Sequence, residues 1–157
     1  INQVVRQPRA SSDAFGFWNT PVHPFNHQNF AFIHAPGFND HTTLQNILVN
    51  LDQYLASAQP RDQPLRLTGI IYVYPEEAPD DSTLGPILQT LKAFVGSDYA
   101  ERVTLYLSPG QESCHGLNPK AILESSPVIR LFYDNTPDPK IITSSLNRQT
   151  IDKILGF

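Results

Sequence analysis

The chain alternates between short, continuous apolar runs and longer stretches in which apolar residues recur at helical spacing. The apolar runs cover residues 29–38, 65–75, 102–110 and 127–135. Each is rich in β-branched or aromatic residues and is bounded by Pro, Gly or Asn, a pattern typical of buried strands. The pattern predicts a buried strand in each run, and the Pro36-Gly37 turn ends the first of them.

Two stretches between these runs show the spacing of amphipathic helices. The first follows Asp40, a predicted N-cap, and the second ends at Gly96, a predicted C-cap. Their apolar faces carry Leu44, Ile47, Leu48, Leu51, Tyr54, Leu55 and Ala58 in one helix, and Leu84, Ile87, Leu88, Leu91, Phe94 and Val95 in the other. Residues 111–126 are expected to be a polar excursion, and residues 136–157 to supply a last helix.

Strands that alternate with helices predict βαβ units with right-handed crossovers. We therefore expect one α/β domain over residues 1–157, with three layers, α/β/α, a mainly parallel central sheet and an irregular segment over residues 1–28. Ligands of such sheets bind beyond the carboxyl ends of the strands. The segments expected there are HAPGFND, YPEEAPDDS, SPGQES and DNTPD.

Composition narrows the classes of partner. The net charge is −4 without any block of Lys or Arg, so neither nucleic acid nor an anionic membrane is an expected partner. One cysteine, Cys114, permits no intramolecular disulfide and favours a soluble, cytoplasmic protein. No apolar run is long enough to span a bilayer. Because the 157 residues include no Met, even at position 1, we expect a processed form, a fragment or a chain without its true start.

Several of these segments, taken in order, resemble a degenerate P-loop GTPase-like domain of the septin-like and immunity-associated type, as in the G-domain proteins of fungi. The sequence FAFIHAPGFND stands where that family has a strand followed by Asp-Thr-Pro-Gly-Phe-Asp-Asp, its second switch. LTGIIYVYPEEAPDDSTLGPILQTLKAFVG is similar to the next strand and helix of the family. RVTLYLSPG corresponds to the strand before the guanine-recognition motif, and PVIRLFYDNTPDPKIITSSL to the late strand and the start of the last helix.

The chain departs from this family at the motifs that bind phosphate, magnesium and guanine. No Gly-x-x-x-x-Gly-Lys-Ser/Thr loop occurs to wrap phosphates. His34 replaces the carboxylate that would hold magnesium, and Ala35 replaces the following Thr. Only His34, Pro36 and Gly37 remain as vestigial nucleotide-binding positions. The guanine-reading motif is replaced by SPGQE. The resemblance therefore implies a GTPase-like fold, whereas these departures imply that the chain does not hydrolyse GTP and needs no cofactor.

Histidines around this turn raise a metal-site alternative. His23, His27, His34 and His41, with Asp40, are residue types that zinc accepts. Combined with the acidic segment that contains Glu76, Glu77, Asp80 and Asp81, they would fit a small metal-dependent hydrolase using zinc or magnesium. Solvated loop histidines and a solvated acidic connection are the simpler interpretation. The adjacent Cys114 and His115 are a weak candidate for a nucleophile and base, because adjacent side chains seldom point at one another.

An aromatic cluster near the start, Phe15, Phe17, Trp18 and Phe25, either packs against the sheet or forms a surface for a partner. A sheet without its usual central strand has an edge that invites association. The leading hypothesis is a non-catalytic pseudo-GTPase that acts by protein binding or self-association. The metal-dependent hydrolase and a proteolytic fragment of a GTP-binding protein are the alternatives.

Overall fold

The computed structural model describes residues 16–19, 23–25, 28–38, 40–57, 66–74, 80–107, 118–134, 136–143 and 149. The chain divides into two compact units, Ile1–Arg66 and Leu67–Phe157, which are considered separately below. The prediction of a single domain over residues 1–157 stays a prediction.

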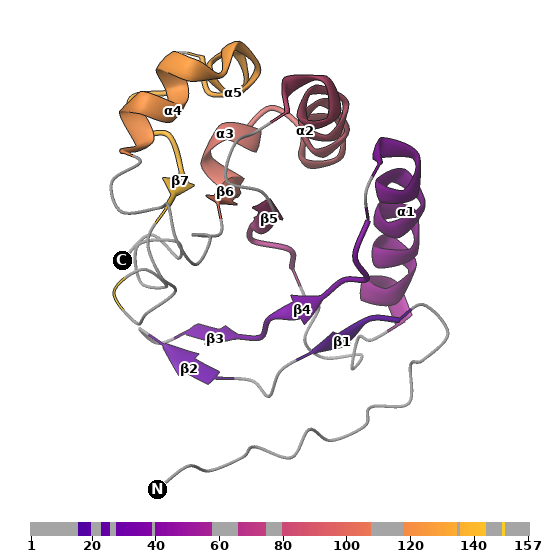
Figure 1. Cartoon of the computed structure of the whole chain (residues 1–157). Helices are drawn as coiled ribbons and strands as arrows, with labels where there is room; N and C mark the ends of the chain where they lie inside the picture. Colours follow the sequence, from indigo (N-terminus) through magenta and orange to yellow (C-terminus); the bar gives the residue numbers. More distant parts are fainter. Residues whose placement is uncertain are drawn as a thin grey trace, which may run out of the picture. The chain divides into compact units, whose positions relative to one another are not determined.

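The first unit contains an antiparallel β-hairpin built from four short strands (Figure 1). β1 (Trp18–Asn19) pairs with β4 (Ile33–His34), and β2 (His23–Phe25) pairs with β3 (Gln28–Phe30). Phe25 is the partner of Gln28, so residues 26 and 27 connect the two arms. Three residues separate β1 from β2 and two separate β3 from β4, so the register shifts by one residue between the two ladders.

The buried strand predicted over residues 29–38 is therefore wrong in two respects. The run is divided between β3 and β4, and both pair antiparallel. Ile33 is half-buried and His34 is exposed. A two-residue connection allows only an antiparallel partner, and an antiparallel hairpin can leave one face in water. An apolar run alone does not distinguish this arrangement from a strand buried on both faces.

The helix predicted after Asp40 is confirmed as α1 (His41–Ser57). The Asp40 carboxylate accepts a hydrogen bond from the Thr43 backbone N–H at 2.8 Å, as an N-cap does. Phe17 is 3% exposed, and its ring centroid lies 5.5 Å from that of Tyr54 on the buried side of the helix. The buried face of α1 consists of Leu44, Ile47, Leu48, Leu51 and Tyr54.

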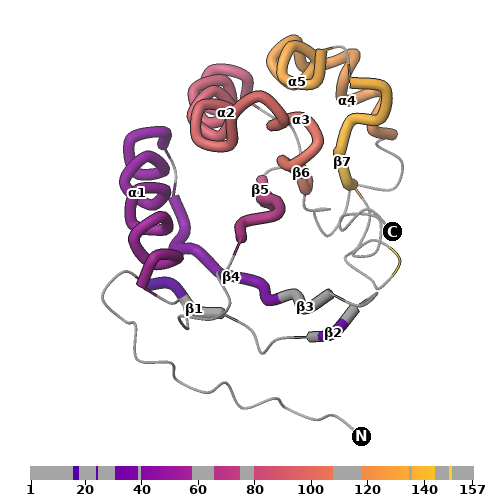
Figure 2. Tube along the Cα trace, turned by 180° about the vertical axis from the view of Figure 1, so that it is seen from behind, coloured from indigo at the N-terminus to yellow at the C-terminus, as the bar shows by residue number. Residues whose placement is uncertain are grey.

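The second unit is a three-stranded parallel sheet with helices on one of its faces (Figures 1 and 2). The strands β5 (Ile70–Tyr74), β6 (Val103–Leu107) and β7 (Ile141–Ile142) lie in that order. α2 (Asp81–Val95) and α3 (Tyr99–Arg102) connect β5 to β6, and α4 (Pro119–Ser125) and α5 (Pro127–Phe132) lie between β6 and β7. Consecutive strand order with right-handed crossovers places both connections on the same face.

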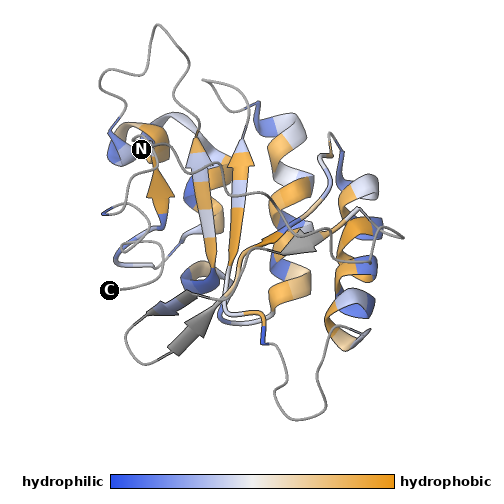
Figure 3. Ribbon diagram, turned by 90° about the horizontal axis from the view of Figure 1, so that it is seen from below, coloured by the Kyte–Doolittle hydropathy of each residue, from blue (hydrophilic) through white to orange (hydrophobic). Residues whose placement is uncertain are grey.

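Apolar residues dominate the sheet of this unit (Figure 3). All five residues of central β6 are buried. The strand at residues 102–110 and the helix ending at Gly96 were predicted correctly. A strand also lies within residues 65–75, but its prediction as a central strand buried on both faces is wrong for β5. Val73 is 52% exposed, and β5 stands first in the described order of the sheet. The observed class is mixed α/β with a parallel three-stranded sheet.

The predicted strand at residues 127–135 is wrong, because this segment forms α5 and a turn. The Ser126 hydroxyl accepts a hydrogen bond from the Ile129 N–H at 3.3 Å, and Pro127 occupies the first turn. Ile129, Phe132 and Tyr133 are buried at helical spacing. This correction removes one of the family correspondences, in which residues 127–135 stood for the late strand.

The third strand of the sheet lies instead at Ile141–Ile142, inside the stretch predicted to be the last helix. That prediction is wrong at these two residues, and residues 144–148 and 150–157 lie outside the described part of the chain. Tyr133 joins α5 to the strands: its Oη lies 2.8 Å from the Val103 carbonyl oxygen and 3.1 Å from that of Lys140. Burial raises the pKa of this phenol, so the neutral form that donates hydrogen bonds is retained.

Candidate functional site

The carboxyl ends of the parallel strands are the expected location of a ligand site in this fold class. The connections that begin there, residues 75–79, 108–117 and 144–148, lie outside the described residues. Glu76 and Glu77 of the acidic segment fall there, as do Cys114 and His115. The hypotheses on these four residues therefore stay predictions, and the described part of this sheet edge begins again at Asp80.

Asp80 is the N-cap of α2. Its Oδ1 accepts hydrogen bonds from the Ser82 N–H at 3.0 Å and from the Ser82 hydroxyl at 2.7 Å, and its Oδ2 accepts one from the Thr83 hydroxyl at 3.0 Å. The bonds from Ser82, followed by that from Thr83, lower the pKa of the Asp80 carboxyl below its ordinary value of 3.8. Both oxygens of this carboxylate therefore accept hydrogen bonds from the first turn of the helix that it begins.

Asp81 has a different partner. Its Oδ1 accepts a hydrogen bond from the hydroxyl of Ser126, which is 2% exposed and is the N-cap of α5. This contact joins the first turn of α2 to the first turn of α5. The sequence analysis did not find this pair, although the adjacent Ser126-Pro127 is a helix-start signal that would have located the cap. The two described carboxylates of the acidic segment thus have structural partners.

The switch-like turn over residues 34–37 lies between β4 and α1. His34, Ala35 and Gly37 are exposed, and Pro36 is half-buried. A Cβ placed on Gly16 would lie 3.1 Å from Pro36 Cγ, and Gly16 has a φ of 70°, so glycine suits this position for two reasons. The vestigial nucleotide positions His34, Pro36 and Gly37 thus lie in one short segment, in which Pro36 is the half-buried residue.

Asp40 is the carboxylate nearest to this turn in the sequence. Its Oδ1 accepts from the Thr43 N–H at 2.8 Å, and its Oδ2 accepts from the Thr43 hydroxyl at 2.9 Å. These two hydrogen bonds lower the pKa of the Asp40 carboxyl. As at Asp80, both oxygens are occupied by the first turn of a helix. A cation held by Asp40 would have to compete with the cap of α1.

The metal-site hypothesis concerns His23, His27, His34, His41 and Asp40. His41 is the exposed first residue of α1, and His34 is exposed at the end of β4. His27 lies outside the described residues, as does the side chain of His23. Within the described ranges, no three His, Cys, Asp or Glu side chains are gathered closely enough to hold a metal ion. The four-histidine site itself stays a prediction.

The predicted aromatic partner surface is only partly described. Phe17 belongs to the core of the first unit, where it contacts Tyr54, so it takes no part in an exposed surface. Phe15 and the side chains of Trp18 and Phe25 lie outside the described residues. The exposed apolar side chains that are described lie elsewhere: Val49 on α1, Val73 on β5 and Leu131 on α5.

No protein-family model matches the chain, and neither does any curated protein or any solved structure. Among the helices of the described residues, none combines the length and the apolar character needed to cross a membrane.

Proposed function

We propose that the chain is a GTPase-like α/β domain with a three-layer arrangement, that it has no GTPase activity, and that it acts by self-association. The order of the elements supports the resemblance. An antiparallel hairpin leads into the Pro36-Gly37 turn and then into α1, and the second unit has parallel strands in consecutive order. The resemblance implies this order of a strand, a switch-like turn and a helix, followed by further strand and helix pairs.

The main observation in favour of an absence of GTP hydrolysis is that the carboxylates near the predicted site accept hydrogen bonds within the structure. His34 stands exposed at the position where the resemblance implies a magnesium-associated Asp. Asp40 and Asp80, which are acidic and close to the predicted site segments, each have both oxygens engaged in capping a helix. Magnesium prefers oxygen ligands and tolerates little deviation from octahedral geometry. A turn with His34 and Ala35 offers it no side-chain carboxylate.

Self-association is supported by the character of β5. This strand, Ile-Ile-Tyr-Val-Tyr, contains no charged residue and no proline, the two features that commonly protect an edge strand. Among the described strands it pairs only with β6, and it stands first in the order of the sheet. Val73 is 52% exposed, whereas its partner across the ladder, Tyr106, is 7% exposed. An apolar, uncharged edge of this kind favours the addition of another strand.

A second copy of β5 is the partner that the sequence of the strand fits. With a two-fold axis at Tyr72, the strands of two copies would run antiparallel, and Ile71 of each would lie opposite Val73 of the other. β-Branched and aromatic cross-strand pairs are the stabilising kind. The strand has five residues, so the contact is smaller than the roughly 800 Å² per partner of a standard interface. We therefore expect a weak dimer, with a Kd of about 100 μM.

Sedimentation velocity over a concentration series tests this proposal, with the Val73→Lys substitution as the disrupting variant. Lysine on an edge strand opposes strand pairing, because its charge cannot be buried against a second copy. The wild-type protein is expected to show a rising weight-average sedimentation coefficient, and Val73→Lys a constant, monomeric one.

Val49→Lys is the matched control, because Val49 is also an exposed valine, at 59%, but lies on α1. It is expected to associate as the wild-type chain does. A wild-type chain that stays monomeric throughout the series, or an equal loss in both variants, would overturn self-association through β5.

A further inference from the structure

The start of the second unit lies against the end of α3. Leu67 is the first residue of this unit, and β5 begins three residues later, at Ile70. Arg102 is the last residue of α3 and immediately precedes β6. Ile70 pairs with Val103, so the residues just before the two strands, Gly69 and Arg102, are also neighbours across the ladder. The segment that leads from one unit to the other thus meets one arginine side chain.

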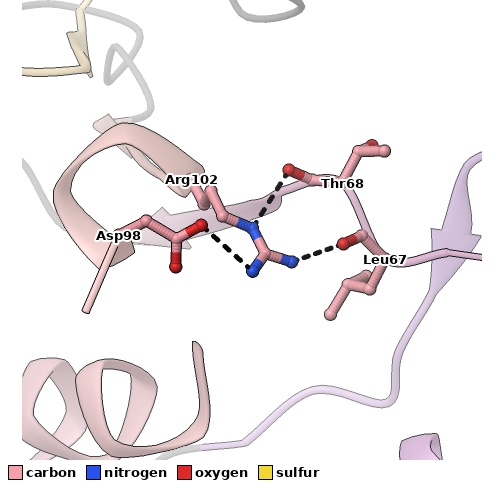
Figure 4. A network of polar contacts seen from close by, with 4 residues as sticks. All are labelled: Leu67, Thr68, Asp98 and Arg102. Carbon is pink, nitrogen blue, oxygen red and sulfur yellow. Dashed lines mark hydrogen bonds and ion pairs between the residues drawn. The ribbon is translucent and has the colours of Figure 1, made fainter. Parts of the chain in front are cut away.

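The guanidinium of Arg102 joins this segment to α3 (Figure 4). Nη2 donates a hydrogen bond to the Leu67 carbonyl oxygen, and Nε lies 3.4 Å from that of Thr68. Nη1 lies 3.5 Å from Asp98 Oδ2, one helical turn earlier. The planar guanidinium can direct several N–H groups at once, which a lysine ammonium cannot do with the same geometry. One side chain therefore holds two consecutive carbonyl groups.

The backbone at the same place is closely packed. A Cβ built on Gly69 would lie 3.1 Å from the Arg102 carbonyl oxygen, closer than nine in ten real contacts of a Cβ. Glycine at this position lets the two backbones approach, while the arginine side chain reaches back over Leu67 and Thr68. The side chain and the main chain of Arg102 thus contact three consecutive residues ahead of β5.

We propose that Arg102 is a strap that fastens residues 67–69 to α3 and so keeps the start of β5 paired with β6. The Asp98 contact alone would not have this effect. The Asp98 and Arg102 side chains are 53% and 29% exposed, and solvent-exposed ion pairs of this spacing contribute little. The carbonyl contacts span 34 and 35 residues of sequence, so they join two segments that lie far apart in the chain, just before the paired strands β5 and β6.

Hydrogen–deuterium exchange of the full chain, followed by mass spectrometry, tests the strap with the Arg102→Gln variant. Exchange of the amides at residues 68–74 is expected to rise by about tenfold or more, because hydrogen bonds from charged donors are among the stronger ones. The amides of α2 and of α5 are expected to exchange at the wild-type rate. This local pattern separates a strap from general destabilisation, which would raise exchange in all elements of the unit.

Two further variants sharpen the test. Arg102→Lys keeps the charge near Asp98 but loses the planar fork, so we expect an intermediate rise in exchange confined to the same residues. It also stands in for the Gln variant if that protein does not fold. Arg130→Gln removes an exposed arginine from α5 and is the matched control, with unchanged exchange at residues 68–74. Unchanged exchange in Arg102→Lys, or an equal rise across the whole unit, would overturn the proposal.

Discussion

At the scale of single residues, the carboxylates of Asp40 and Asp80 illustrate how a candidate ligand becomes a structural group. Both are acidic residues beside turns that the sequence marks as candidate site segments. Both use their two oxygens to cap helices, and the hydrogen bonds that they accept lower their pKa values. The sequence identified the capping role of Asp40, because an apolar helical pattern begins directly after it. At Asp80, the neighbouring Glu76, Glu77 and Asp81 suggested a cation site instead.

The cap at Asp80 predicts a dependence of stability on pH. A carboxyl whose pKa is lower in the folded protein stabilises the fold above the ordinary value of 3.8, and this contribution is lost as the pH falls through the lower, folded pKa. At pH 7, Asp80→Ala should lower the urea midpoint, because the α2 N–H groups lose their acceptor. Asp80→Asn should lower it less, because asparagine also caps helices.

The dependence of stability on pH separates the contribution of the negative charge of Asp80 from that of its ability to cap the helix. Urea midpoints of the wild-type protein and of Asp80→Asn, measured from pH 7 down to about pH 2, should converge at the acid end, because protonation removes the advantage of the carboxylate. Asp40 titrates in both proteins and so does not affect the comparison. Parallel profiles with a constant separation would show that the Asp80 charge does not contribute in the expected way.

At the scale of elements, the sequence predicted the helices α1 and α2 from apolar residues at helical spacing. It predicted the strands β5 and β6 from continuous apolar runs. It failed at residues 127–135, where Val128, Ile129 and Phe132 favour a strand by composition but a helix by their spacing. The cap at Ser126 and the proline after it decide in favour of the helix. It also failed at Ile141–Ile142, because two residues are too few for a period, and their pairing with β6 is a tertiary contact.

Gly85 in α2 gives a prediction at this scale. A Cβ at this position would lie 3.7 and 3.8 Å from the two methyl groups of Val128 on α5, an ordinary van der Waals contact. Glycine inside a helix is less favourable than alanine, but Pro86 follows Gly85, and a Cβ on the residue before proline disfavours helical backbone. These two effects oppose each other, so Gly85→Ala should change the free energy of unfolding by less than about 1 kcal/mol. Urea denaturation followed by circular dichroism measures this change.

Gly96 is the matched control for that substitution. It ends α2 with a φ of 95° and a ψ of −153°, a conformation that residues with a Cβ rarely adopt. Gly96→Ala should therefore lower the free energy of unfolding by about 1–3 kcal/mol. The same chemical change is expected to have a larger, destabilising effect at Gly96. An equal loss of stability at the two positions would contradict this expectation.

At the scale of the whole molecule, the sequence predicted the mixed α/β class, and its 157 residues contain no Gly-x-x-x-x-Gly-Lys-Ser/Thr loop. It could not show which turn residues have hydrogen-bond partners, because the same residue type, Asp, can either cap a helix or bind a cation. Under the proposed function, the exposed His34 and the two engaged carboxylates would account for an absence of GTP hydrolysis.

The central claim is that the chain has a GTPase-like fold without nucleotide binding. Isothermal titration of the full chain with GTPγS in the presence of magnesium tests it most directly. We predict no saturable heat up to millimolar nucleotide, because the sequence contains no phosphate-wrapping loop and the resemblance implies that the magnesium carboxylate and the guanine-reading motif are replaced. Saturable binding that depends on magnesium would contradict the account and would favour a functional GTP-binding protein.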